Sequence, residues 1–364
     1  MKVSFSDVLE IRNGRNQKAV ENPNGTYPIY GSGGMMGRAD DYICPANTVV
    51  IGRKGSINNP IFVEEPFWNV DTAFGLVADE TRLLPRYLYY FCVHFDFEKL
   101  NTTVTIPSLT KANLLKLAFD LPEISTQKQV VSILDRIEGI MKKRQQELNA
   151  LDDLIKARFV EMFGDPVHND RKWPIRPLDD VCRTIVDCPH STPSYTSEDT
   201  GYMCIRTSIV KKNRILWDNI EYISKEEFEQ RIKRKKPETG DVIYTREGAI
   251  LGIAAVIDKD CNVALGQRSM LLSPDKKYIT PEFLSIAMNF DSFLDSALRG
   301  MIGSASPHIN VSDIKKSMIV LPPIERQKVF SEFVTQIKKT RISVQNALDD
   351  LQQLFNSLMQ KHFG

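Results

Sequence analysis

Side chains that can hydrogen bond to base edges or phosphates recur in this chain at polar turns. Arginine pairs best with guanine, and asparagine and glutamine pair best with adenine, because each presents two hydrogen-bonding groups to one base edge. In the first half of the chain the candidates are Arg12, Arg15, Ser32, Gly33, Arg53, Lys54 and Ser56. In the second half they are His190, Arg206, Thr207, Arg246, Gln267 and Arg268. The chemistry that these residue types favour is recognition of polar edges and anions.

The same residues also have structural interpretations. Arg53 and Arg246 occupy matched RKG and REG turns, which are equally consistent with one salt bridge shared by the two halves. The glycine-rich stretch 31–34 is as consistent with a tight turn as with a close approach to a ligand. For the basic run 231–236 a solvated face is the favoured interpretation. Phosphate contact, which adds affinity without sequence information, is the second choice for that run.

Three short strings imitate catalytic motifs, but two lack an essential part and the third is only a loose match. The string NPIF at 59–62 lacks the second proline of the NPPY motif of amino methyltransferases. GSGGMMG at 31–37 has neither GxGxxG spacing nor the lysine of a phosphate-binding P-loop. The residues Pro274, Asp275, Asp313 and Lys315 follow a nuclease PD and DxK pattern only loosely. We therefore expect no catalytic activity in the chain itself.

The cysteines do not form a recognisable metal or disulfide framework. Cys182, Cys188 and His190 lie close in sequence, but their spacing matches no usual zinc pattern and a fourth ligand is missing. The six cysteines are scattered without a CxxC pair, which favours reduced and mostly buried thiols. We expect neither a metal nor a cofactor.

Composition restricts the class of protein further. The chain has 364 residues, 42% hydrophobic and 26% charged, which is enough for two or more globular cores. A net charge of +1 does not favour a nucleic-acid partner, although cations can gather on one face. No window approaches the roughly 18 apolar residues of a membrane span, and the N-terminus has no signal-peptide pattern. These features predict a cytoplasmic protein.

The chain contains an internal repeat, and the candidate residues lie on the elements that it repeats. Its matching segments are 4–11 with 177–184, 46–57 with 239–250, and 105–122 with 305–322. Each half contains an entry segment, a strand-rich region with an RxG turn, a PxLxxxxL or PxIxxxxI segment, an LP phrase and a helical pattern. The β-branched and aromatic runs NTVVIG and DVIYTR predict strands. We therefore interpret each half as a mixed α+β globule.

After each LP phrase, apolar residues recur mostly three, four or seven positions apart, which predicts a long amphipathic helix. The first stripe is Val130, Ile133, Ile137, Met141, Leu148, Leu151, Ile155 and Phe159. The second is Phe330, Phe333, Ile337, Val344, Leu348, Leu351, Phe355 and Leu358. Gly164 is a normal helix stop. A helix of nearly forty residues is about 58 Å long, which exceeds one small core, so the two stripes should pack on each other as a coiled coil.

The order of these parts, given twice, carries a family resemblance. The most specific parts are LPEISTQKQ from Leu121, LPPIERQKV from Leu321, YPIYGSGGMMG at 27–37, the RKGSI and REGAI turns, and the PSL and PHI segments. With these parts the chain resembles the specificity subunit of a type I restriction and modification system. The resemblance covers essentially the whole chain.

The resemblance implies an α+β fold with two mixed target recognition domains in tandem, at residues 1–122 and 165–322. Long spacer helices would follow at 123–164 and 323–364 and pair as an antiparallel coiled coil. Each domain would read one half of a bipartite DNA target. The implied partners are two methyltransferase subunits that methylate adenine and two translocase and nuclease subunits, while the chain itself is not catalytic.

Physical arguments agree with that division. Two readers must keep a fixed separation and rotation, because one turn of duplex advances about 34 Å. The two copies differ in sequence, so the two half-sites need not be alike. The rival interpretations are a coiled-coil scaffold that joins two interaction domains and, less favoured, a DNA methyltransferase.

The LP phrases are interpreted as junctions. Proline ends the preceding strand, and the residues that follow begin the helix. Gln127 and Gln327 occupy matched places in the two phrases. A contact with a partner subunit and a cap of the helix start are both open for them.

Overall fold

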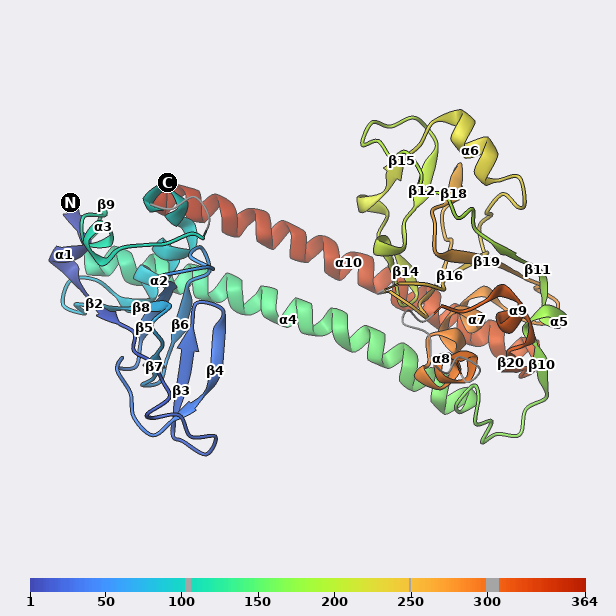
Figure 1. The fold of residues 1–364 in the computed structure, drawn as a ribbon, viewed down its shortest axis with the longest axis horizontal. Coiled ribbons are helices and arrows are strands. Elements are labelled where there is room, and N and C mark those ends of the chain that lie inside the picture. The colour runs from blue at the N-terminus through green and yellow to red at the C-terminus, as the bar shows by residue number, and fades with distance from the viewer. Residues whose placement is uncertain (102–105, 249, 299–307) are drawn as a thin grey trace. The chain divides into compact units, whose positions relative to one another are not determined.

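The computed structural model describes residues 1–101, 106–248, 250–298 and 308–364. Two compact units are found: unit 1 is Met1–Gln146 with Gln345–Gly364, and unit 2 is Glu147–Val344. Each holds a strand-rich globule and parts of two long helices, α4 (Ile124–Phe163) and α10 (Ile324–Phe363) (Figure 1). The predicted α+β class with two long helices is confirmed. Parts of the repeat, Thr105, Ala249 and residues 305–307, lie outside the described residues.

Unit 1 is built on an antiparallel four-stranded sheet. Its strands, in spatial order, are β2 (Leu9–Asn13), β8 (Ala73–Ala78), β5 (Thr48–Gly52) and β6 (Ile61–Val63). A second sheet has the order β4 (Gly34–Ala39), β3 (Tyr27–Gly31) and β7 (Trp68–Asn69), with β3 and β7 parallel. β1 (Lys2–Ser4) pairs with β9 (Ala118–Asp120). The helical elements are α1 (Phe5–Val8), α2 (Pro85–His94), η1 (Phe97–Leu100) and α3 (Lys111–Leu115).

Unit 2 repeats this topology. Its four-stranded sheet has the order β11 (Cys182–Asp187), β19 (Ser269–Pro274), β16 (Val242–Thr245) and β17 (Ala254–Val256). The second sheet is β15 (Glu221–Tyr222), β12 (Met203–Ile205) and β18 (Val263–Leu265), with β12 and β18 parallel. β10 (Ile175–Pro177) pairs with β20 (Met318–Val320). The repeat seen in the sequence is therefore a repeat of strand order.

Unit 2 carries further elements on this frame. Its α-helices besides α4 and α10 are α5 (Leu178–Val181), α6 (Lys225–Arg231), α7 (Pro281–Met288), α8 (Asp291–Leu298) and α9 (Val311–Lys316). The segment between β12 and β15 holds η2 (Thr207–Ile209), the hairpin β13 (Val210–Lys211) and β14 (Arg214–Ile215), and η3 (Trp217–Asn219). In unit 1 the matching strands β3 and β4 are joined directly by the turn Ser32–Gly33.

In unit 1 the start of α4 packs beside the end of α10, so the two helices run antiparallel there. Val130 and Leu134 of α4 are buried in one core with Met359 of α10, and Phe355 packs against that core. Leu134 is 1% exposed, whereas Ile133 is 48% exposed. The prediction that Ile133 belongs to the packed stripe is wrong. The face of α4 that packs against the globule carries Leu134 instead, and Ile133 points towards solvent.

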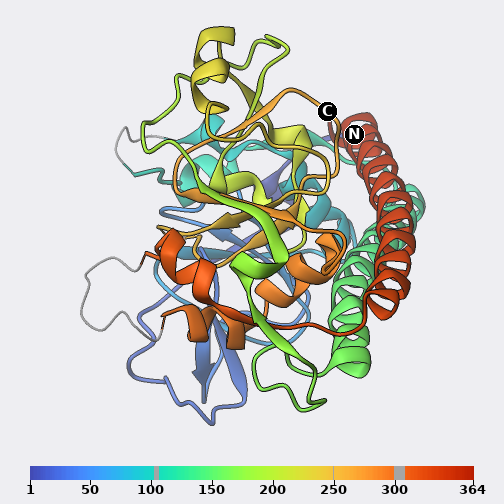
Figure 2. The same ribbon diagram turned by 90° about the vertical axis from the view of Figure 1, so that its right-hand side faces the viewer.

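In unit 2 the end of α4 packs beside the start of α10 (Figure 2). Phe159 and Phe163 of α4 are fully buried against Phe330 of α10, with ring centroids 5.5 Å apart in both pairs. The ring of Phe283 in α7 joins this cluster, 5.1 Å from Phe159. The helix segments are thus parts of each unit's core as well as of a helix pair. Gly164, with φ of +78°, ends α4 as predicted.

Gln127 and Gln327 clamp each LP junction to its globule. Gln127 Oε1 accepts from the Leu84 N–H at 2.9 Å, and its Nε2 donates to Pro122 O at 2.9 Å. Gln327 makes the same pair of bonds, accepting from Thr280 N–H at 3.0 Å and donating to Pro322 O at 2.8 Å. Both side chains are fully buried, so neither can contact a partner subunit. They bind the residues that precede α2 and α7, Leu84 and Thr280, rather than capping their own helices.

No helix in the described part of the chain combines the length and the apolar character that crossing a bilayer requires.

Candidate nucleic-acid interface

The candidate residues of unit 1 lie where β2 and β5 end and β8 begins, because these antiparallel neighbours bring those ends together. The Ser32–Gly33 turn lies beside the 53–56 turn that follows β5. A Cβ placed on Gly55 would lie 3.8 Å from Ser32 Oγ. Gly55 has φ of +84°, a left-handed conformation that glycine adopts without strain. The two turns therefore form one polar edge.

Arg53 is half-buried at this edge, with its guanidinium carbon 5.7 Å from the centre of the Phe74 ring. Its Nη1 makes a long hydrogen bond of 3.5 Å to Asp71 O. Its backbone N–H donates to Thr72 O at 2.7 Å, which fixes the turn. Among the described residues no carboxylate forms an ion pair with Arg53, so its charge is available to a ligand.

The other candidates of unit 1 differ in how tightly they are held. Arg12 Nη1 donates to Ile43 O at 2.7 Å, and its Nη2 forms an ion pair with Glu10 at 3.3 Å. The guanidinium of Arg12 is thus largely engaged within its own unit. The exposed candidates are Arg15, Gly33, Lys54 and Ser56, with Ser32 half-buried.

In unit 2 the matching arginine, Arg246, is buried in an ion pair. The side chain of Arg246 is 7% exposed and forms an ion pair with Asp187, with Nε 3.0 Å from Oδ1. Its Nη2 lies 3.3 Å from Asp187 Oδ2, and its Nη1 donates to Ile309 O at 3.3 Å. A buried charge requires such a partner, because desolvation is costly. The salt bridge that was an open alternative for both arginines is therefore present at Arg246, and within the described part of the chain Arg53 has none.

His190 completes the cluster around Asp187. Its Nε2 lies 3.0 Å from Asp187 Oδ2, and its Nδ1 lies 3.4 Å from Arg246 Nη2. The His190 side chain is nevertheless 64% exposed. The ring therefore projects from the edge while both of its nitrogens are engaged inside the unit.

Gln267 and Arg268 form the turn that leads into β19, next to the Arg246 turn. Gln267 Oε1 accepts a hydrogen bond from Thr192 Oγ1 at 2.8 Å, which links two loops of this edge. Arg268 is exposed, has φ of +65°, and accepts the backbone N–H of Arg246 at 3.0 Å. Within the described residues its guanidinium forms no ion pair. Among the candidate arginines of unit 2, Arg268 is thus the one whose guanidinium has no ion-pair partner within the described residues.

Arg206 and Thr207 follow β12 beside the same turn, since Gly266 N–H donates to Ile205 O at 2.9 Å. Arg206 Nη1 donates to Glu221 Oε2 at 2.6 Å, and this hydrogen bond raises the pKa of Arg206. The Arg206 guanidinium also lies 4.7 Å from the ring centre of Tyr195. Arg206 is exposed but oriented by two neighbours. Thr207 begins η2 and is half-buried.

Sequence reasoning missed Asp187 and its counterpart Asn13. The register pairs that relate them are Asn13–Phe74 and Ile51–Phe74 in unit 1, and Asp187–Met270 and Tyr244–Met270 in unit 2. Asn13 therefore occupies in unit 1 the place of Asp187 in unit 2. Extending the match of the two entry segments by a few residues would have brought both into view. A β-bulge after Cys182 shifts that match by one position.

The basic run 231–236 was expected to be a solvated face, and this is wrong for Arg231. Its side chain is 2% exposed, with Nε 3.1 Å from Glu227 Oε1. Its Nη2 donates to Ser191 O at 2.7 Å. Arg234 Nη1 donates to Asp187 O at 3.2 Å. Part of the run therefore supports the loop that carries His190.

The six cysteines are free thiols, and five of them are buried, as predicted. Burial raises the pKa of Cys44, Cys182 and Cys204 to about 12. Over residues 1–101, 106–248, 250–298 and 308–364, no group of three or more His, Cys, Asp or Glu side chains is placed to hold a metal ion.

Comparison with known proteins adds to this geometry. The family model of the type I restriction modification DNA specificity domain matches residues 1–150 and 170–353. The type I restriction enzyme EcoBI specificity subunit of Escherichia coli is 22% identical over 409 residues, which cover 100% of this chain and 85% of that protein. The EcoKI specificity subunit of Escherichia coli K12 is 23% identical over 360 residues, covering 88% and 75%.

Two solved structures share the fold. The S subunit of a type I restriction-modification system from M. genitalium aligns with a TM-score of 0.64 at 13% identity, covering 100% of this chain and 96% of that one. A chain from a study of complex assembly and conformational transition in the type I R-M system aligns with a TM-score of 0.56 at 16% identity, covering 100% and 97%.

Proposed function

The chain belongs to the family of type I restriction-modification DNA specificity subunits, and on this premise we propose how it recognises DNA. A specificity subunit selects the DNA sequence on which a type I complex acts and is not itself catalytic.

We assign one half of a bipartite target to the polar edge of unit 1 and the other half to the polar edge of unit 2. The observation that carries this assignment is the repeated topology: the turns after β5 and β16 end equivalent strands of equivalent sheets. The exposed side chains at these turns differ between the units. One scaffold with different hydrogen-bonding groups can read two different half-sequences. Residues 1–122 and 165–322 would be the two recognition domains.

The DNA contacts would come from the exposed and half-buried members of each edge. In unit 1 these are Arg15, Ser32, Gly33, Arg53, Lys54 and Ser56. In unit 2 they are His190, Arg206, Thr207, Gln267 and Arg268. Arg12 and Arg246 would act by holding neighbouring groups in place, because their guanidiniums already have partners. Arg268 is the strongest candidate for bidentate contact with a guanine.

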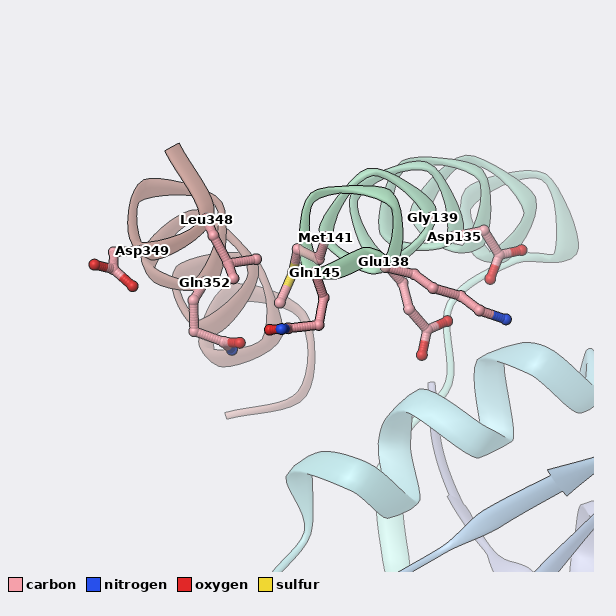
Figure 3. Close-up of a pocket in the computed structure, with 9 residues that line it drawn as sticks. Asp135, Glu138, Gly139, Met141, Gln145, Leu348, Asp349 and Gln352 are labelled. Carbon is pink, nitrogen blue, oxygen red and sulfur yellow. The ribbon is translucent and has the colours of Figure 1, made fainter. Parts of the chain in front are cut away.

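The two long helices would set the spacing between half-sites and bind the partners of the complex. In unit 1 a groove between α4 and α10 is lined by polar and apolar side chains (Figure 3). Met141 and Gln145 of α4 face Leu348 and Gln352 of α10 across it. This groove supports docking of a methyltransferase subunit. Two such subunits, together with restriction and translocase subunits, would complete an adenine-methylating complex in the cytoplasm, where the cell's DNA lies.

Domain exchange tests the division of labour. We expect replacement of residues 1–120 by those of a family member with another target to change one half of the methylated sequence and leave the other intact. The readout is methylome sequencing of cells that express the methylase. A change in both halves contradicts independent reading.

The rival function is a scaffold whose helices join two interaction domains. Duplex binding distinguishes the two, because phosphate contacts release counterions and make affinity fall steeply with salt. We expect the full chain with its methyltransferase subunits to bind duplex DNA in this manner. A complex that assembles without binding duplex DNA favours the scaffold.

A further inference from the structure

A pocket opens in unit 1 beside Arg53. Its lining comes from β2, β8, the turn after β5, and the segment that begins α3. The lining residues are Asn13, Arg53, Phe74, Ser108, Leu109, Thr110 and Lys111. Arg53 O accepts the Leu109 N–H at 2.9 Å, which ties the two sides of the pocket together.

The lining has the chemistry of an anion site. Among the described residues that line it, Arg53 and Lys111 are cations and none carries a carboxylate. Lys111 Nζ donates to Ile11 O at 2.7 Å, which fixes the ammonium and leaves its other N–H groups for a ligand. Phe74 lies beneath the Arg53 guanidinium and restricts its motion. The amide of Asn13 adds a further possible donor.

The equivalent place in unit 2 is filled differently. Asp187 stands where Asn13 stands in unit 1, and Val311 stands where Lys111 stands, 200 positions later. The Asp187 carboxylate neutralises Arg246 in a buried ion pair. An incoming anion would meet a carboxylate there in place of an amide, and the uncharged Val311 takes the place of the Lys111 ammonium. The anion site is therefore a property of unit 1.

Resting on the proposed function, we propose that this pocket binds one backbone phosphate of the DNA at the half-site of unit 1. Phosphates project from the duplex and fit a concave cationic site, whereas base edges lie in a groove and require a projecting side chain. Arg53 thus contributes affinity and register rather than sequence choice. The other exposed residues of the polar edge, rather than Arg53, would read the bases in unit 1.

The test uses the full chain with its methyltransferase subunits and three variants: Arg53→Gln, Asn13→Asp and the control Lys99→Gln. Asn13→Asp introduces the residue of unit 2 and offers Arg53 the ion pair that Arg246 has. Lys99 is exposed in η1 and does not line the pocket. Lys99→Gln therefore removes one exposed positive charge outside the pocket. Affinity for duplex DNA is measured against salt, and the methylated sequence is determined for each variant.

We expect Arg53→Gln and Asn13→Asp to weaken binding to every duplex alike. The slope of log K against log salt should fall in magnitude by about 0.9, the value for one lost phosphate contact, with an unchanged methylated sequence. Lys99→Gln should leave the slope as it is. A relaxed base preference in one half-site, or a slope unaltered in Asn13→Asp with normal thermal stability, overturns the proposal. Failure of the unmodified complex to bind duplex DNA refutes the proposed function instead.

Discussion

Unit 1 and unit 2 share one strand order but differ in the electrostatics at the turns that follow β5 and β16. The clamps of Gln127 and Gln327 make the same bonds in both units. The arginines after β5 and β16 do not, because Arg246 is buried with Asp187, while Arg53 faces a pocket whose described lining residues include no carboxylate. The difference teaches that a matched residue in a repeat need not keep its role. The neighbouring strand carries asparagine in unit 1 and aspartate in unit 2, and only the aspartate can form an ion pair with the arginine.

The largest effect is expected from altering the helices that both units share. We expect removal of one turn from both α4 and α10 to shorten the DNA segment between the two half-sites by about 1 to 2 base pairs. A helical turn rises about 5.4 Å, and a base pair rises about 3.4 Å. The original target would then no longer be methylated. Methylome sequencing provides the readout, and alanine substitution of the same residues at unchanged length is the control. An unaltered gap would rule out a spacer role.

The next largest effect should follow from breaking the locked pair of unit 2. Asp187→Ala leaves the Arg246 charge buried without a partner, which should cost about 3 kcal/mol of unfolding free energy. Asn13→Ala, its counterpart in unit 1, should cost less than about 0.5 kcal/mol. Denaturant unfolding monitored separately for each unit measures both. Equal losses in the two units would contradict the difference drawn between them.

The glutamine clamps should respond alike. Gln127→Ala and Gln327→Ala each leave buried backbone groups unpaired, at an expected cost of about 1–3 kcal/mol. Gln129→Ala is a matched control, because Gln129 is exposed on the same helix. Thermal unfolding of the three variants makes the comparison. If only one of the two clamps mattered, the shared junction would not be a common device of the fold.

A smaller effect is expected at the exposed salt bridge of unit 2. Arg206→Gln removes an ion pair with Glu221 that is open to water, so stability should fall by less than about 1 kcal/mol. If Arg206 contacts DNA, the half-site of unit 2 should be methylated less efficiently while that of unit 1 keeps its sequence. Loss of stability comparable to that of Asp187→Ala would show that Arg206 is structural.

Much of the fold follows from local patterns in the sequence. The repeat, the strand NTVVIG, the two long helices and the stop at Gly164 are all set by residues within one element, so periodicity and turn signals find them. Ile133 was misplaced because a stripe with mixed spacings of three and four leaves the buried face uncertain by one residue. Leu134 fills that position.

The candidate site was predictable only in outline. The turns that carry Arg53 and Arg246 were found from the repeat, but the lock on Arg246 depends on Asp187, 59 residues earlier, across an antiparallel sheet. Arg231 was likewise assigned to solvent because Ser191, which accepts its hydrogen bond, lies 40 residues away. Asp187 reaches Arg246 through strand register, and Ser191 reaches Arg231 through the packing of a loop against α6. A single sequence specifies neither.

Methylome sequencing of a host that expresses this chain with its methyltransferase subunits tests the central claim most directly. Two readers on one chain predict adenine methylation within an interrupted sequence, with two specified halves separated by an unspecified gap of fixed length. Methylation of one continuous sequence, or no methylation that depends on this chain, would contradict the account.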